Sequence, residues 1–395
     1  MKIYKDSLRH VLTGTIAPTR GTPTVSSFGI LDRHDCSVFH PVVTTKFQGI
    51  KNMTTELVWM MRGLSNNTWL LEHGCTIWDE FDVLELTEAE VQEKLAEIGI
   101  VADLSKVDSE TLLKLADAVD VKVTTGDLGP VYGQMMARWP TTDGQEINQL
   151  DELIDNLRKN PFSRRHLVSM WNPEFLPNEK HSHRENIKRG KQVLPPCHVS
   201  FQVMIRNEPL FASLTGDSDH TDVSYAHELW REAVRQSLTD VPFDEWVTSV
   251  ISTEEDYVAK ILELKEYKKG TIKELDEETL RFMYNHRHVD LMFNMRSNDK
   301  PLGEPYNKAN YATLLAMIAH LLGYERGELI HVTGNSHIYL NQLDGVTEIL
   351  GREPKQLPTL TIEDRGQKYL SDFEISDFTL HNYESHPKIE FEMNV

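Results

Sequence analysis

The sequence lacks the long apolar runs of membrane proteins and the many cysteines of disulfide-stabilised secreted proteins. No run of about 18 apolar residues occurs, so we expect no membrane span. The N-terminal residues Met1–Lys5 lack the apolar core of a signal peptide. Three cysteines, Cys36, Cys75 and Cys197, are too few for a disulfide framework. We therefore expect a cytoplasmic protein.

Positive charge is scarce as well. The chain has 41 Lys and Arg residues against 61 Asp and Glu residues, which gives a formal net charge of −20. Because a nucleic-acid backbone requires a basic protein surface, we expect no nucleic-acid partner. Any anionic small molecule must be held by a local group of arginines that acts against the overall negative field.

The 395 residues are 39% hydrophobic and 26% charged, a composition typical of a globular protein. Short β-rich runs alternate with helical patterns, which predicts an α+β fold with a mixed β-sheet layered with helices. We expect strands at residues 42–45, 165–171, 199–205 and 289–295, and helices at residues 52–62 and from about 311 to 322.

Three stretches have the character of insertions, at about 83–125, 178–193 and 208–286. The first has the pattern of two amphipathic helices, with N-terminal capping signals at Thr87 and Asp108. The second is basic and polar, and the third contains charged helical patterns. We expect a single domain over residues 1–395 that these insertions interrupt.

Cys197 is the first candidate for chemistry. It follows two prolines, which stiffen the approach of the chain, and it immediately precedes an expected strand. His198 and nearby cations would lower the pKa of the thiol and favour the nucleophilic thiolate. A buried structural cysteine is the alternative, and this is our interpretation of Cys36 and Cys75.

Several arginines lie in turns or near the ends of expected strands. The guanidinium group matches phosphate oxygens bidentately, and a serine hydroxyl adds a further donor. The candidates for an anion site are Arg20, Arg164, Arg165, Arg296 and Ser297. Surface salt bridging is the alternative for any single arginine.

Polar side chains near the same segments could recognise a neutral ligand. Asn307 can read an amide edge with its donor and its acceptor, or it can cap the helix that follows. His337 and Tyr339 alternate on one face of a strand-like segment, where they could donate to a sugar hydroxyl or pack in the core.

Glu56 lies inside an apolar helical pattern, where desolvation would raise the pKa of its carboxyl group toward the range of general acid–base catalysis. A paired structural glutamate is the alternative. Trp78 offers a flat stacking surface, or it belongs to the core. The His181-Ser182-His183 and His286-Arg287-His288 motifs lack the spacing of a zinc site, so we expect no metal.

The order of these motifs along the chain resembles the thymidylate synthase family. The resemblance covers the start of the chain and residues 38–81, 127–177, 194–206 and 289–395. The matching stretches are Pro41–Lys46, Glu56–Trp59, Thr76–Glu80, Asp127–Gly133, Ser163–Arg165, Pro196–His198, Arg296–Asp299, Gly303–Asn307, His337–Tyr339 and the tail from His386 to Val395.

The resemblance implies a role for each candidate residue. Cys197 would be the nucleophile that adds to C6 of dUMP, and Asn307 would read O4 and N3 of the base. The waters for proton transfer would be organised by Glu56, Tyr132 and His198, with Asp299 as a further catalytic group. The phosphate would be bound by Arg20, Arg296 and Ser297, and the 3′-hydroxyl by His337 and Tyr339.

The resemblance also implies an obligate homodimer, in which Arg164 and Arg165 reach the phosphate of the partner subunit. The cosubstrate would be 5,10-methylenetetrahydrofolate. Its contacts would come from Trp78, Asp299, Leu302, Gly303 and Tyr306, with Val395 closing the site.

The implied reaction has two outcomes. Addition of the thiolate at C6 makes C5 an enolate carbon that attacks the folate methylene. Hydride from tetrahydrofolate then gives dTMP, as in the synthases, whereas water gives 5-hydroxymethyl-dUMP.

Several departures from the synthase pattern favour the water outcome. Asn335 stands where the synthases carry Asp, Phe81 replaces a second Trp, and Asn394 replaces Ala beside the terminal residue. With the insertions, these changes favour a phage-type dUMP hydroxymethylase of the host cytoplasm, with thymidylate synthase as the alternative. A non-catalytic nucleotide-binding protein is the alternative from another class, and the joint presence of Cys197 and Glu56 argues against it.

Overall fold

The computed structural model describes residues 1–19, 21–81, 88–97, 99–100, 104, 126–207 and 287–392. The chain divides into two compact units, Met1–Met204 with Val289–Val395, and Ile205–His288. Of the second unit, only residues 205–207 and 287–288 are described, as parts of two strands. The single domain with an insertion at 208–286 therefore stays a prediction.

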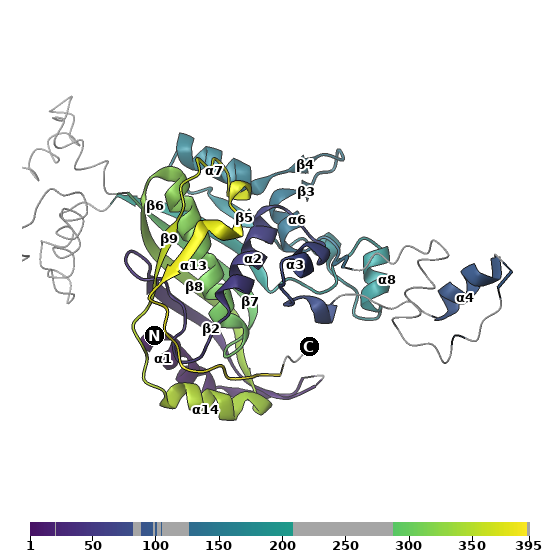
Figure 1. Ribbon diagram of the computed structural model, residues 1–395, viewed down its shortest axis with the longest axis horizontal. Helices are drawn as coiled ribbons and strands as arrows, with labels where there is room; N and C mark the ends of the chain where they lie inside the picture. Colours follow the sequence, from purple (N-terminus) through teal and green to yellow (C-terminus); the bar gives the residue numbers. More distant parts are fainter. Residues whose placement is uncertain are drawn as a thin grey trace, which may run out of the picture. The chain divides into compact units, whose positions relative to one another are not determined.

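A six-stranded sheet runs through the first unit in the order β1-β2-β8-β7-β6-β5 (Figure 1). Strand β2 is antiparallel to both β1 and β8, and β5 is antiparallel to β6. The strands are β1 (Thr15–Ala17), β2 (Thr24–Asp35), β5 (Leu167–Ser169), β6 (His198–Asn207), β7 (Arg287–Asp299) and β8 (Glu325–Tyr339). Two small antiparallel sheets pair β3 (Trp139–Pro140) with β4 (Glu146–Ile147), and β9 (Thr359–Ile362) with β10 (Phe378–His381).

Helices pack against this sheet, and the α+β prediction is confirmed. The described helices are α1 (Lys2–Leu12), α2 (Ile50–Met61), α3 (Thr68–Glu72), α4 (Glu88–Glu97), α6 (Tyr132–Ala137), α7 (Gln149–Lys159), α8 (His183–Lys188), α13 (Gly303–Leu322) and α14 (Leu343–Gly351). Helix α13 packs along β8 and contacts α2 and α7, whereas α1 contacts β2, β8 and α14 (Figure 1). Within the described part of the chain, no helix is long and apolar enough to cross a membrane.

Helix α13 begins earlier in the sequence than expected. The apolar pattern predicts a helix from about residue 311, but the structure extends it back to Gly303. The first two turns carry Glu304 and Lys308, which resemble exposed loop residues in the sequence, yet both are buried and form an ion pair. The helix ends at Gly323, whose left-handed φ of 66° suits a residue without a Cβ.

The strand expected at residues 42–45 is wrong, because these residues form no strand. Val42 packs in one hydrophobic cluster with Met53 and Ala309, whereas Val43 packs in another with Tyr4. The β-branched character of this segment therefore reflects two separate core contacts rather than pairing in a sheet.

Other expectations are confirmed with shifted ends. The strands at 199–205 and 289–295 lie within β6 and β7, and the helix at 52–62 corresponds to α2. The strand at 165–171 shortens to the three residues of β5 that pair with β6. In the stretch 83–125, α4 corresponds to the first expected helix, and the second lies outside the described residues.

Phe293 on β7 offers a direct test of this core. Its buried ring stacks on the rings of Tyr311 and His331, with centroid distances of 4.0 and 4.3 Å. Phe293→Ala is expected to lower the free energy of unfolding by about 3–5 kcal/mol, because it leaves a cavity. Urea unfolding measures the loss. Phe47→Ala, at a half-exposed ring, is the matched control, and equal losses in both variants would contradict this packing.

Candidate active site

Cys197 lies in a turn that two other elements hold in place. It directly precedes β6, and its backbone N–H donates to the hydroxyl of Tyr132 at the start of α6, over 3.0 Å. From β7, the guanidinium of Arg296 donates through Nε to the carbonyl of Pro196 (2.9 Å) and through Nη2 to that of Pro195 (2.8 Å). The two carbonyls of the stiff proline turn thus bind one arginine, and this fixes the position of the sulfur.

Two opposing effects act on the Cys197 thiol. Burial raises its pKa, whereas the charge of Arg296, with Nη2 4.0 Å from Sγ, lowers it, and burial prevails. The expected lowering by a nearby cation therefore comes from Arg296, but the neutral His198 adds no charge and burial outweighs the arginine. Cys36 and Cys75 are buried free thiols, as expected.

His198 is a neutral group in this site. Burial lowers its pKa to about 4, and a hydrogen bond with the side chain of Asn307 opposes this shift. Its Nδ1 lies 3.2 Å from the hydroxyl of Tyr311, and its ring packs edge-on against Tyr132, with a centroid distance of 5.1 Å. A neutral imidazole so placed can donate one hydrogen bond and accept one, but it supplies no positive charge to Cys197.

Glu56 on α2 is buried and carries two donors. The indole Nε1 of Trp78 donates to Oε1, and Nδ2 of Asn310 donates to Oε2, each over 3.0 Å. Burial raises the pKa of Glu56, and both hydrogen bonds oppose the rise. Such a carboxyl group can exchange a proton nearer neutral pH than an exposed one.

Asp299 lies at the junction of β7 and α13. Its Oδ1 accepts from the backbone N–H of Leu302 (3.0 Å), and its Oδ2 accepts from Nε2 of Gln342 (2.8 Å). Burial raises the pKa of Asp299, and these two hydrogen bonds and Lys46 oppose the rise. Gln342 also accepts from the backbone N–H of Tyr339, so one glutamine joins Asp299 to the end of β8.

His337 and Tyr339 lie together near the end of β8. Their rings meet edge to face with a centroid distance of 5.1 Å, and Nδ1 of His337 lies 2.9 Å from Oδ1 of Asn335. The pKa of Tyr339 is raised by burial and by the charges of Asp299 and Cys197, so this hydroxyl shares the electrostatic environment of the nucleophile.

The candidate phosphate ligands do not all meet in one place. Arg296 reaches Cys197 and is exposed, with Ser297 beside it on β7. Arg164 and Arg165 are exposed before β5, and Arg165 lines a cavity of about 460 Å³ with Trp139, Glu152 and Trp171. Their contact with a partner subunit stays a prediction. Arg20 and Val395 lie outside the described residues.

The residues expected at the folate surround the start of α13. Leu302 and Gly303 form the beginning of this helix, and the hydroxyl of Tyr306 accepts from the backbone N–H of Gly49 at 3.5 Å. Trp78 is only 5% exposed and packs against Trp59 and Tyr132, so its main visible contact is with Glu56 rather than with an open surface.

Asn307 points its amide toward β7. Its Nδ2 donates to Oδ1 of Asn298 (3.3 Å) and lies 3.6 Å from the sulfur of Met295. Sequence reasoning identified Asn307 but assigned no role to Asn298, Asn310, Tyr311 or Gln342. Asn310 and Tyr311 lie one turn beyond Asn307 on α13, and that helical spacing is the signal that could have found them.

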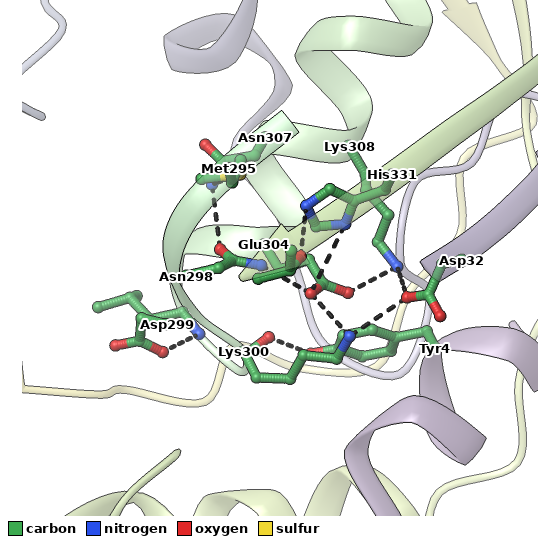
Figure 2. A network of polar contacts seen from close by, with 12 residues as sticks. Tyr4, Asp32, Met295, Asn298, Asp299, Lys300, Glu304, Asn307, Lys308 and His331 are labelled. Atoms are coloured by element: carbon green, nitrogen blue, oxygen red, sulfur yellow. Dashed lines mark hydrogen bonds and ion pairs between the residues drawn. The ribbon is translucent and has the colours of Figure 1, made fainter. Parts of the chain in front are cut away.

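A buried group of charged side chains lies next to Asn298, and we call it the ion cluster. Figure 2 shows its members, Asp32, Lys300, Glu304, Lys308 and His331. Lys300 Nζ lies 2.7 Å from Glu304 Oε2 and 3.2 Å from Asp32 Oδ2. Lys308 Nζ lies 2.8 Å from Glu304 Oε1 and 3.7 Å from Asp32 Oδ2.

The ion cluster balances its own charge. Burial lowers the pKa of His331 to about 3, so its ring is neutral, and two ammonium groups face two carboxylates. The possible metal ligands Asp32, Glu304 and His331 lie within 4.8 Å of one another, but the lysines already supply positive charge at both carboxylates.

Comparison with known proteins agrees with this arrangement. The family model described as thymidylate synthase matches residues 2–233 and 266–395. A thymidylate synthase of Pseudomonas fluorescens (strain SBW25) is 28% identical over 397 residues, covering 100% of both chains. A thymidylate synthase of Listeria monocytogenes serotype 4b (strain F2365) is 28% identical over 407 residues, again covering 100% of both chains.

The pH dependence of alkylation tests the electrostatics of Cys197. Its rate of reaction with iodoacetamide, followed by mass spectrometry, is expected to rise with pH through a midpoint above the ordinary thiol value, because burial raises the pKa. Arg296→Gln is expected to move the midpoint higher, and Arg296→Lys, which keeps the charge, to move it less. Cys36 and Cys75, whose pKa values burial raises to about 12 and about 11, provide slow internal controls. An unchanged midpoint in Arg296→Gln would refute the role of this charge.

Proposed function

The chain belongs to the thymidylate synthase family, and we propose that it transfers the one-carbon unit of methylenetetrahydrofolate to C5 of dUMP to form dTMP. The observation that carries this proposal is the setting of Cys197. Its sulfur lies at the end of a stiff turn, 4.0 Å from a guanidinium nitrogen, with Tyr132 bound to its backbone N–H. Both full-length relatives named above are thymidylate synthases, which favours the methyl product.

The residues around Cys197 have separate roles in the reaction at the pyrimidine ring. When the sulfur bonds to C6, negative charge moves to O4 of the pyrimidine, where hydrogen-bond donors stabilise it. Asn307, whose amide hydrogen-bonds to the neutral His198, can direct a donor to that oxygen. Glu56, with its raised pKa, can accept and return the protons that the reaction exchanges.

The phosphate is assigned to the exposed side of Arg296. The contacts with the proline turn use Nε and Nη2, which leaves Nη1 for an anion. A phosphate bound there would lie beside Ser297. The same arginine would then position both the substrate and the nucleophile.

The residues at the start of α13 fit a folate in their chemistry. The partly buried carboxylate of Asp299 can accept N–H groups of a polar ring, while Leu302 and Tyr306 offer apolar surface beside it. The folate would supply the one-carbon unit and, for the methyl product, a hydride. The amide of Gln342 would keep Asp299 oriented.

We retain the homodimer as part of the proposal. Arg164 and Arg165 are exposed and would extend to the phosphate of a partner subunit. Large apolar side chains on β2 are also exposed, including Phe28 (88%) and Leu31 (56%), which is typical of a surface that another protein covers.

The hydroxymethyl product is the second candidate, because two contacts involve the residues that depart from the synthase pattern. Phe81 lies beside Trp78 with a ring-centroid distance of 5.6 Å, and it fills less space than the usual Trp. Asn335, in place of Asp, contacts His337 without a negative charge. The smaller ring beside Trp78 would leave space for water, and the lost charge would alter the setting of the sugar ligand His337.

Product analysis tests the proposal. We expect purified protein, incubated with dUMP and methylenetetrahydrofolate, to form dTMP and an equal amount of dihydrofolate, measured by mass spectrometry and absorbance. Cys197→Ala is the control that retains the fold but lacks the nucleophile. A hydroxymethyl nucleotide without dihydrofolate would establish the second candidate. Binding of dUMP by folded protein with no product would favour the non-catalytic alternative.

Asn394, which lies outside the described residues, provides a test specific to the second candidate. If water captures the intermediate because a polar group stands next to the C-terminus, Asn394→Ala is expected to shift the product toward dTMP. The ratio of hydroxymethyl to methyl nucleotide is the measurement. An unchanged ratio would show that Asn394 does not direct the water.

A further inference from the structure

The amide of Asn307 can serve two different bases. In one rotation its oxygen accepts from N3–H of uracil and its nitrogen donates to O4. After a half-turn, the oxygen accepts from the 4-amino group of cytosine and the nitrogen donates to N3. An asparagine therefore selects uracil only if its surroundings fix the rotation.

A directed chain of hydrogen bonds fixes the rotation of Asn307 (Figure 2). Oε2 of Glu304 accepts from Nδ2 of Asn298 over 2.7 Å. Because an ionised carboxylate has no proton to donate, Asn298 must turn its NH₂ group to Glu304 and its oxygen away. That oxygen accepts from Nδ2 of Asn307 over 3.3 Å.

The lysines of the ion cluster keep Glu304, the first group in this series of hydrogen bonds, ionised. Burial disfavours the charged form of Glu304, but the charges of Lys308 and Lys300 prevail and hold its pKa well below the ordinary value. Glu304 is fully buried and Asn298 is 3% exposed, so bulk water has little access to either group. Reversal of Asn298 would place its oxygen against a carboxylate in a medium of low polarity, which is costly.

The other side of Asn307 agrees with this direction. The hydrogen bond between the side chains of Asn307 and His198 raises the pKa of His198, which is the effect of an imidazole N–H that donates to the amide oxygen. The second hydrogen of Nδ2 faces the sulfur of Met295, a weak acceptor that a carbonyl oxygen of the ligand can replace. The amide therefore retains one donor and one acceptor position for the base.

We propose that Asn298 and Glu304 are positioning residues that lock Asn307 in the uracil-reading rotation and so make the site select dUMP over dCMP. The proposal rests on dUMP being the substrate. It adds the reason why an asparagine, which could rotate to fit cytosine, does not. Neither positioning residue need touch the nucleotide.

The lock can be tested by two measurements on dUMP and dCMP, the binding affinity by calorimetry and the value of kcat/KM. Asn298→Ala leaves the ion pairs of Glu304 in place but frees Asn307. We expect the preference for dUMP to fall by about fivefold to a hundredfold, the range for one buried amide that loses its partner. Glu304→Gln is expected to lower it too, because a glutamine amide can donate and lets Asn298 reverse.

Two further variants separate positioning from loss of stability. Asp32→Asn removes a carboxylate from the same two lysines, whereas the carboxylate that Asn298 contacts is that of Glu304, so we expect lower thermal stability with an unchanged base preference. The double variant Asn298→Asp with Glu304→Gln restores an acceptor that binds Nδ2 of Asn307, and it should recover the preference.

The outcomes distinguish the lock from the proposed function. An unchanged preference in folded Asn298→Ala, or a loss in Asp32→Asn equal to that in Glu304→Gln, would overturn the lock. Tighter binding of dCMP than of dUMP by the unaltered protein would also overturn it, because the locked rotation would then read cytosine. Selective dUMP binding that depends on Asn298, with no turnover, would support the lock while the proposed reaction failed.

Discussion

The carboxylate of Glu304, held between the ammonium groups of Lys300 and Lys308, is the interaction on which the site depends. It draws the first two turns of α13 into the core, where charged residues would not otherwise lie. Removal of one partner from a buried ion pair typically costs about 3–5 kcal/mol, because it leaves a charge without compensation. The buried ion pairs therefore help to fix the position of the start of α13, and with it that of Asn307.

Burial shifts three ionisable groups of the site toward their uncharged forms. Burial favours the thiol of Cys197, the neutral imidazole of His198 and the protonated carboxyl of Glu56. The positive charge enters from the exposed side, through Arg296. This separation suits a reaction in which charge develops on the bound ligand, because fixed dipoles and one cation then stabilise it with little reorganisation.

Sequence patterns predicted the elements that periodicity defines and missed those that distant contacts define. The strands β6 and β7 and helix α2 follow from apolar runs of the right length. The first turns of α13 did not, since Glu304 and Lys308 resemble surface residues until their partners are known. The strand predicted at residues 42–45 was wrong for the converse reason, because β-branched residues that make core contacts have the same sequence pattern as a buried strand.

The same limit applies to the site. Cys197 and Glu56 stand out by local context, a proline turn and an apolar helix. Asn298 and Gln342 act through residues that lie elsewhere in the fold or the chain, and no local pattern marks such a role.

Because the charges of the ion cluster compensate one another, they also limit which substitutions this protein can accept during evolution. Asp32, Lys300, Glu304 and Lys308 form one unit, so a substitution at any one of them strands a charge on its neighbours. Relatives should therefore carry either the whole charged set or an apolar set, with few intermediates between them. A path between these two sets passes through intermediates, and those that lack Glu304 leave the amide of Asn298 without its acceptor. The preference for uracil and the residues of the ion cluster would then change together among relatives.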